Sequence, residues 1–330
     1  MKESKKRQIV FWALSSLILL SGVYLAIVSG ATDISVSQIV QGLLSHSDTL
    51  EITLIRDVRI PRVIAVLMTG GILGITGAMI QGVTRNPIAE PSLIGVSQGA
   101  TFVVAVFFVA GIAVTTFHTM IAAFIGAAFS GSLVIIFLSN RKNRNSMTKI
   151  LLAGTAISTL FISLTTIIGF LSNKAQFIAF WIAGGFRNVT WIDCYISIFF
   201  AATGLIFAFL MAKKINTLSL GDDIAIGLGE NPGRIRLVVL LAMIVLSAVA
   251  VAIGKNIVFV GLIVPQISRK WLGEDYKVVL PASFILGALL LTYSDIAARL
   301  LLDPYEMPIG IFTAIIGVPF FLAVARKEKG

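Results

Sequence analysis

The chain has 330 residues, of which 57% are hydrophobic and 13% charged, and its formal net charge is +10. Soluble domains are nearer half apolar and a quarter charged, so this composition excludes a soluble domain and indicates an integral membrane protein. The basic residues lie at the edges of apolar runs, a pattern of membrane orientation that argues against a nucleic-acid partner.

Apolar runs suited to transmembrane helices follow one another along the whole chain. We predict an all-α integral membrane fold with about ten spans, forming one transmembrane domain over residues 1–330. The spans lie near 9–29, 60–82, 93–110, 115–138, 149–171, 191–212, 235–254, 257–269, 278–297 and 308–325. The first follows a basic tail and resembles a signal peptide, but it is long enough to cross a bilayer, and we expect it to be retained.

The distribution of lysine and arginine predicts the orientation of these spans. Nineteen of the 26 basic residues fall on the face that carries both termini, and seven fall on the other face. Because basic loops stay in the cytoplasm, both termini and the segment 219–236 are predicted to be cytoplasmic. The seven residues on the other face are Arg56, Arg59, Arg62, Lys174, Arg187, Lys255 and Arg299.

No residue pattern indicates catalysis or a cofactor. Cys194 is the only cysteine, which excludes an internal disulfide, and His46 and His118 fall in predicted loops far apart in sequence, so no metal site is expected. No hydrophilic run is long enough for a nucleotide-binding domain. We therefore expect no enzyme activity in this chain.

Ionisable residues are missing from the middle of every predicted span. Ion-coupled carriers place such groups at membrane depth because those groups perform the coupling. An ion-coupled secondary carrier is therefore disfavoured as an alternative, and so is a membrane-bound enzyme or receptor. The energy for transport is therefore expected to come from a cytoplasmic partner protein.

Gly70, Gly74 and Gly77 recur at helical spacing in the second span. Small residues let two helix backbones approach closely in a membrane, so this pattern predicts tight helix packing and no chemistry.

A polar stripe runs along the fifth span. Its members recur at spacings of three and four and therefore share one helix face: Thr155, Ser158, Thr159, Ser163 and Thr166. Hydroxyl groups commonly join membrane helices, and helix packing is one interpretation. The other is an uncharged wall of a path for a large polar solute.

Arginines on the predicted outer face require a separate explanation. Arg59 and Arg62 flank Pro61, and Arg299 ends the ninth span. They either reach lipid headgroups, pair with nearby aspartates such as Asp295, or dock an acidic partner. The residues alone leave these interpretations open.

The segment 219–236 is the longest polar interruption in the second half of the chain. Ser219 is predicted to cap a short helix with Asp222 in its first turn, and Gly229 to end it. Asn231 and Pro232 are predicted to start the next helix. Ile224, Ile226 and Leu228 are apolar within this exposed segment, which predicts a docking surface rather than a solvated connector.

These residues resemble one known family. The chain is similar to permease subunits of the large type II ABC importers for iron-siderophores, haem and vitamin B12, over nearly all of 50–325. The motifs that carry the resemblance are RIPRVIAVLMTGGILGITGAMIQGVTRNPIAEPSLIGVSQGA (59–100), KILLAGTAIS (149–158), WIAGGFRNVTW (181–191), LSLGDDIAIGLG (218–229), FVGLIVPQISR (259–269) and DIAARLLLDPYEMPIG (295–310). Gln266 departs from the family pattern, because many members have histidine at this position. Residues 1–50 resemble the family only in general character.

The resemblance implies an assembly in the bacterial cytoplasmic membrane. Two permease chains, identical or related, would surround a central pathway, two cytoplasmic ATPase subunits would supply energy, and an external binding protein would deliver the substrate. The commonest cargo in the family is a ferric siderophore, with haem and vitamin B12 as alternatives.

The resemblance also implies roles for particular residues. Arg59, Arg62 and Arg299 match family arginines that pair with glutamates of the binding protein. The segment 219–236 matches the coupling helices at the ATPase, with Ser219, Asp222, Ile224, Leu228 and Gly229 as its predicted contact and capping residues. Met147 and Thr148 match the cytoplasmic gate, directly before the polar stripe.

Overall fold

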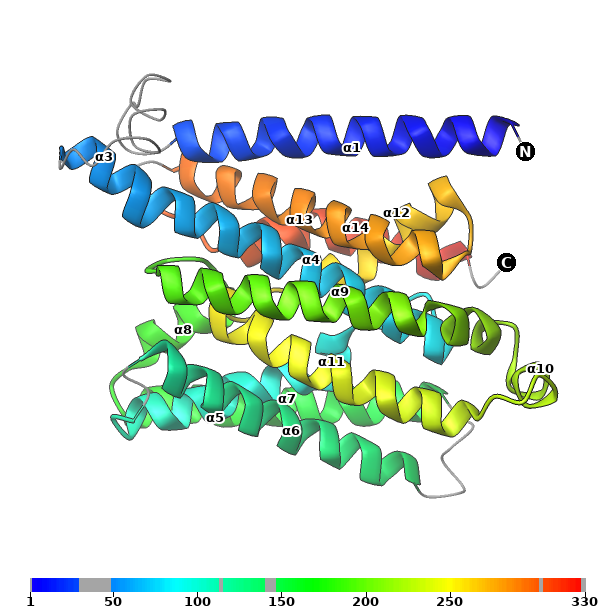
Figure 1. The fold of residues 1–330 in the computed structure, drawn as a ribbon. Coiled ribbons are helices and arrows are strands. Elements are labelled where there is room, and N and C mark those ends of the chain that lie inside the picture. The colour runs from blue at the N-terminus through cyan, green and yellow to red at the C-terminus, as the bar shows by residue number, and fades with distance from the viewer. Residues whose placement is uncertain (1, 30–48, 113–114, 140–146, 303–304, 328–330) are drawn as a thin grey trace.

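The computed structural model describes residues 2–29, 49–112, 115–139, 147–302 and 305–327, and every regular element within them is helical (Figure 1). The elements in chain order are α1 (Lys2–Val28), α3 (Leu50–Leu54), the π-helical turn η1 (Ile55–Arg59), α4 (Ile60–Thr84), the 3-10 turn η2 (Pro91–Ile94), α5 (Val96–Val109), α6 (Thr116–Ser139), α7 (Met147–Leu171), α8 (Ala175–Ala183), α9 (Trp191–Ser219), α10 (Asp222–Gly227), α11 (Pro232–Gly254), α12 (Val260–Leu272), α13 (Tyr276–Leu300) and α14 (Ile309–Lys327).

Each predicted span overlaps one of these helices. Six described helical stretches are both long enough and apolar enough to cross a membrane, and the membrane-crossing of the remaining predicted spans stays a prediction. The shortest predicted span, 257–269, corresponds to an equally short helix in the structure. Its helix, α12, has 13 residues and is therefore about 20 Å long, well short of a bilayer core of about 30 Å.

Polar residues start several helices. Asn231 accepts a hydrogen bond from the Arg234 backbone at the start of α11, and Asp275 accepts one from the Lys277 backbone at the start of α13. Thr190 and Asp193 form a reciprocal capping box at the start of α9. These caps satisfy backbone N–H groups that have no partner inside the helix.

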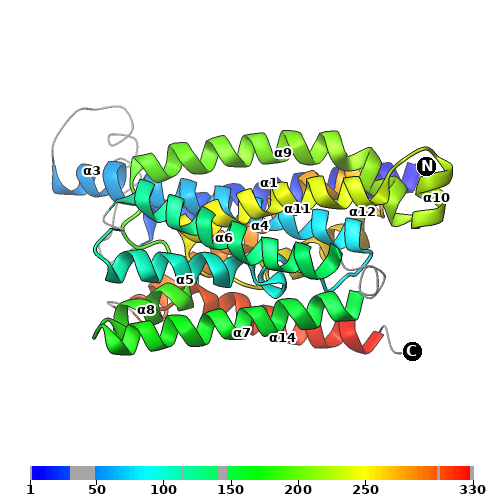
Figure 2. The same cartoon turned by 90° about the horizontal axis from the view of Figure 1, so that it is seen from below.

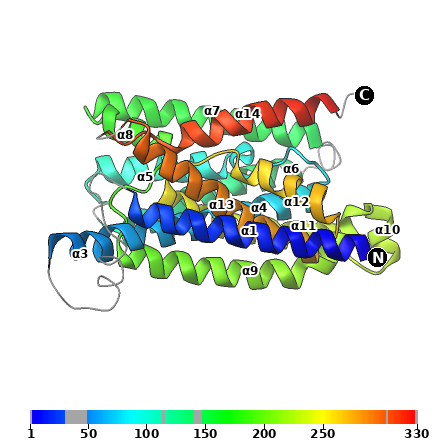
Figure 3. The ribbon, with the colours of Figure 1, turned by 90° about the horizontal axis from the view of Figure 1, so that it is seen from above.

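The long helix α4 forms the centre of the bundle and packs against α9, α11, α12 and α13 (Figures 2 and 3). A Cβ atom added to Gly70 would lie 2.4 Å from the Gly287 carbonyl of α13. One added to Gly74 would lie 2.1 Å from the Ser283 carbonyl, and one added to Gly77 would lie 2.0 Å from the Gly261 carbonyl of α12. The predicted close packing at the three glycines is confirmed.

The bundle has two distinct ends. The N-terminus, the C-terminus and α10 lie at one of them, which we call the α10 end, and α3 and α8 lie at the other, the α8 end (Figure 1). The helices α7 and α14 share one side of the bundle, and α9 lies on the opposite side (Figure 2).

Candidate functional site

Two of the arginines predicted to dock a partner hold the end of α1. Arg59 is buried and donates to the carbonyls of Ile27 and Val28, at 2.8 and 2.7 Å. Arg299 is also buried and donates to the carbonyls of Ala26 and Ser29, at 3.1 and 3.0 Å. The last carbonyls of a helix have no partner within it, so these guanidinium groups satisfy the C-terminus of α1.

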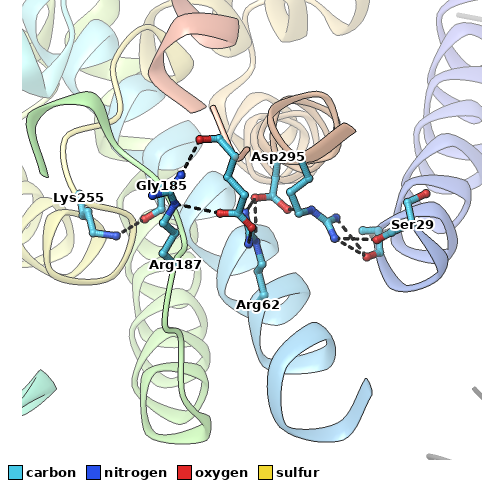
Figure 4. Close-up of polar contacts among 9 residues, drawn as sticks. Ser29, Arg62, Gly185, Arg187, Lys255 and Asp295 are labelled. Carbon is cyan, nitrogen blue, oxygen red and sulfur yellow. Dashed lines mark hydrogen bonds and ion pairs between the residues drawn. The ribbon is translucent and has the colours of Figure 1, made fainter. Parts of the chain in front are cut away.

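The third arginine, Arg62, belongs to a chain of alternating charges that we call the charge chain: Arg187, Glu306, Arg62, Asp295 and Arg299 (Figure 4). Arg62 is 2.9 Å from Asp295 and 2.6 Å from Glu306. Arg187 is 3.1 Å from Glu306, and Arg299 is 3.1 Å from Asp295. The chain thus joins α4 and α13 to the loops that precede α9 and α14.

The electrostatics of Glu306 follow from these contacts. Burial alone would raise the pKa of its carboxyl, but the hydrogen bonds and charges of Arg62 and Arg187 outweigh burial and lower it. Glu306 is therefore ionised between its two arginines. Sequence reasoning did not single out Glu306, and it named Arg187 only as one of seven basic residues on the predicted outer face; both also lie in motifs of the family resemblance.

At the α10 end, the structure corrects the position of one predicted cap. Ser219 is the last residue of α9, and its hydroxyl donates to the Asn216 carbonyl at 2.7 Å. The helix α10 starts at Asp222 instead, after Gly221, whose φ of 131° disfavours any other residue. A serine side chain can cap the helix that follows it or donate back to a carbonyl of the helix that precedes it, and the sequence does not distinguish these two roles.

The other predicted signals around α10 are confirmed. Gly229 has φ 82°, and its N–H donates to the Ile226 carbonyl at 2.9 Å. The next N–H, of Glu230, donates to the Ala225 carbonyl at 2.9 Å, which completes a Schellman motif. Pro232 opens α11 after its Asn231 cap.

Asp222 fixes α10 against the bundle. Its carboxylate lies 2.7 Å from Arg236 of α11 and 3.0 Å from Arg85, which follows α4. Ala225 is fully buried beneath α10. In contrast, Ile224, Ile226 and Leu228 are 50%, 61% and 65% exposed. A short helix held on one side thus presents three apolar side chains outward.

The polar stripe lies on a face of α7 that the described part of the chain leaves open. Thr155, Thr159, Ser163 and Thr166 are exposed, and only Ser158 contacts another element, through the Ser92 carbonyl at 3.3 Å. Thr159 and Thr166 donate to carbonyls of α7 itself, each at 2.9 Å. The stripe therefore does not serve as packing within this chain, apart from Ser158.

The predicted gate residues Met147 and Thr148 begin α7, and their side chains lie outside the described part of the structure.

One buried carboxyl, which lies between two predicted spans, is found inside the bundle. Glu90 is buried, and its carboxyl accepts hydrogen bonds from the Ser92 hydroxyl and the Phe259 N–H. Because α12 starts directly after Phe259 and runs about 20 Å to the α10 end, Glu90 lies well inside the bundle.

This segment lies inside because α4 ends at Arg85, in a left-handed conformation, and the chain then turns back into the bundle. Gln266 donates to the Pro87 carbonyl at 2.7 Å, which supports that path. Irregular backbone at membrane depth is tolerated where protein covers it.

Comparison with known proteins places these features in context. The model of the FecCD transport family matches residues 17–327. The iron(3+)-hydroxamate import system permease protein FhuB of Bacillus subtilis is 38% identical over 313 residues, which cover 94% of this chain and 82% of that one. The Fe(3+)-citrate import system permease protein YfmD of the same organism is 36% identical and covers 99% and 98%.

Two further similarities extend this picture. The hemin transport system permease protein HmuU of Yersinia pestis is 33% identical and covers 83% of each chain. A solved structure described as an inward-facing metal-chelate type ABC transporter has a TM-score of 0.82 and 27% identity, over 96% of this chain and 99% of that one.

Proposed function

The chain belongs to the FecCD transport family and is a multi-pass permease of an ABC importer in the cytoplasmic membrane, and we propose that its cargo is a ferric siderophore. Relatives named for iron(3+)-hydroxamate and Fe(3+)-citrate import support this cargo, at 38% and 36% identity. Haem is the second candidate, because the hemin permease is 33% identical. Vitamin B12 remains an alternative from the family resemblance alone.

The energy would come from two separate cytoplasmic ATPase subunits. The observation that carries this proposal is α10, a six-residue helix anchored by Asp222 and Ala225 that presents Ile224, Ile226 and Leu228 outward. Exposed apolar side chains on a rigid support favour a protein groove over water. Closure of the ATPase would then move α10, and Asp222 would transmit the movement to α11 through Arg236 and to α4 through Arg85.

The translocation path would form between two permease chains, identical or related. The stripe of α7 is open to such a partner, and so is a face of α14 that exposes Ile311, Ile315, Ile316, Val318 and Leu322. These two helices share one side of the bundle (Figure 3). Hydroxyl groups without charge suit a bulky chelate that must bind weakly enough to leave again. Met147 and Thr148 would stand at its cytoplasmic gate.

An external binding protein would deliver the chelate at the α8 end. The arginines of the charge chain, Arg62, Arg187 and Arg299, pair with two carboxylates, and Lys255 lies nearby, so this cluster has a local excess of positive charge that favours an acidic partner (Figure 4). Arg187 is the most exposed arginine of the charge chain and would make direct contact. Arg62, which is more buried, would add to the positive potential of this surface. Arg59 and Arg299 would keep the end of α1 in place.

Reconstitution tests this function. The permease, its ATPase and its binding protein are placed in proteoliposomes, and uptake of radiolabelled ferric hydroxamate, ferric citrate and hemin is measured. We expect ferric hydroxamate uptake that requires ATP and stops when the ATPase nucleotide site is inactivated. Uptake that follows a proton or sodium gradient without ATP would contradict the proposal.

A further inference from the structure

A surface cavity of about 250 Å³ lies at the α10 end, between the start of α1 and the end of α12. It is lined by Lys6, Arg7 and Val10 of α1 and by Trp271 of α12. Its size is close to the lower limit for small-ligand pockets, about 300 Å³. Two cations and an indole ring thus share one concave site that the transport function does not use.

Within the part of the chain whose side chains are described, the two cations of this cavity have no ion-pair partner. Lys6 and Arg7 are exposed, and neither forms an ion pair with another described residue. The acidic residues that follow α12 contact other groups. Glu274 pairs with Arg269 at 3.7 Å, and Asp275 caps α13 and accepts from Asn216 at 2.7 Å. The cavity therefore presents two cations to which an anion from outside the chain could bind.

The wall of the cavity is fixed by packing. Phe11 is buried, and its ring centre lies 6.4 Å from that of Trp271 and 5.3 Å from that of Trp12. Phe11 also belongs to a small core with Leu272 and Ala282. Trp271 is thus held beside the first turns of α1, although it remains 49% exposed.

The level of the cavity along α1 identifies the kind of anion. Directly beyond the cations, α1 exposes apolar side chains to the surroundings of the bundle, among them Ile9, Val10, Leu14 and Leu17. The boundary between headgroups and hydrocarbon therefore falls within one turn of Arg7, where tryptophan and basic residues gather in membrane proteins. A ligand at this site meets cations at its head and a continuous apolar helix face below.

We propose that this cavity binds an anionic phospholipid. Its phosphate lies between Lys6 and Arg7, its glycerol region contacts Trp271, and an acyl chain follows Val10, Leu14 and Leu17 along α1. Basic pockets beside membrane helices bind such headgroups, and each basic residue near the surface contributes about 1 kcal/mol. The proposal does not depend on the cargo or on the partner subunits.

The chain purified in detergent is titrated with brominated phosphatidylglycerol or brominated phosphatidylcholine, which quench tryptophan fluorescence on contact. Subtracting the signal of Trp271→Phe isolates the contribution of Trp271. We expect phosphatidylglycerol to reach half-maximal quenching of Trp271 at a concentration at least tenfold below that needed with phosphatidylcholine, since two cations are involved. Lys6→Gln/Arg7→Gln should remove this preference. The matched control is Lys213→Gln/Lys214→Gln, two adjacent exposed lysines near the end of α9, and it should retain the preference.

Three results would overturn the proposal: equal quenching by the two lipids, an unchanged preference in Lys6→Gln/Arg7→Gln, or loss of the preference in the lysine control as well. Inorganic phosphate is added as a competitor. Displacement of the lipid by phosphate at constant ionic strength would also overturn it, because the cavity would then be a simple anion site.

Discussion

Arg62 and Asp295 form the central contact of the α8 end, where two guanidinium nitrogens of Arg62 lie 3.1 and 2.9 Å from one carboxylate oxygen of Asp295. The other oxygen of Asp295 is 3.1 Å from Arg299, which also holds the end of α1. One carboxylate therefore connects three helices, α1, α4 and α13. Its side chain is only 2% exposed, so water cannot replace it.

Asp295→Asn should destabilise the protein strongly. Breaking a buried ion pair leaves uncompensated charge and costs about 3–5 kcal/mol. The matched control is Asp57→Asn, because Asp57 is 45% exposed and pairs with Arg56 at 3.4 Å, and exposed pairs contribute about 0–1 kcal/mol. Thermal unfolding of the two purified variants in detergent measures the difference. Equal unfolding temperatures for Asp295→Asn and Asp57→Asn would show that the contact does not stabilise the helices.

Arg56→Glu/Arg187→Glu should weaken docking of an acidic binding protein. Both side chains are about 40% exposed, 38% for Arg56 and 43% for Arg187, and reversal turns attraction into repulsion. Reversing Arg59 or Arg299 would be a poorer test, because it would also release the end of α1. The affinity of the binding protein for the reconstituted permease is measured at low and high salt, with Lys213→Glu/Lys214→Glu at the other end as control. We expect a loss that high salt reduces. Equal affinity of the double reversal and the control at low salt would exclude electrostatic docking here.

Labelling of single cysteines tests the orientation of the ten-span topology. With Cys194 removed, cysteines at Asn143 and Tyr305 are exposed to a membrane-impermeant thiol reagent in intact cells. Asn143 lies outside the described residues, and Tyr305 is 77% exposed at the α8 end. The charge distribution predicts labelling at 305 and none at 143. Strong labelling at 143 with none at 305 would require the opposite orientation.

The sequence predicted those features that depend on neighbouring residues or on a regular period. Gly229 and Asn231 act through backbone groups within four residues, so the end of α10 and the start of α11 followed from local rules. One helix face carries Gly70, Gly74 and Gly77, and a face of small residues at this spacing predicts close packing against another helix.

Long-range contacts explain what the sequence did not predict. The partners of Arg59 are carbonyls 31 and 32 residues away, and Glu306 lies 244 residues from Arg62, so no local pattern revealed their roles. Glu90 falls between the predicted spans 60–82 and 93–110. Hydropathy does not show that the chain then turns back into the bundle.

The central claim is that an ATPase drives this permease through α10, and the number of chelates imported per ATP hydrolysed tests it most directly. Leu228→Asp is compared in proteoliposomes with Leu301→Asp, because the two leucines are 65% and 64% exposed but lie at opposite ends of the bundle. Burying a leucine contributes about 1.5–3 kcal/mol, equivalent to a roughly 10- to 100-fold change in ATPase affinity. We predict that Leu228→Asp loses the ATPase or hydrolyses ATP without import, whereas Leu301→Asp keeps the wild-type ratio. A wild-type ratio and wild-type ATPase binding in Leu228→Asp would contradict the account.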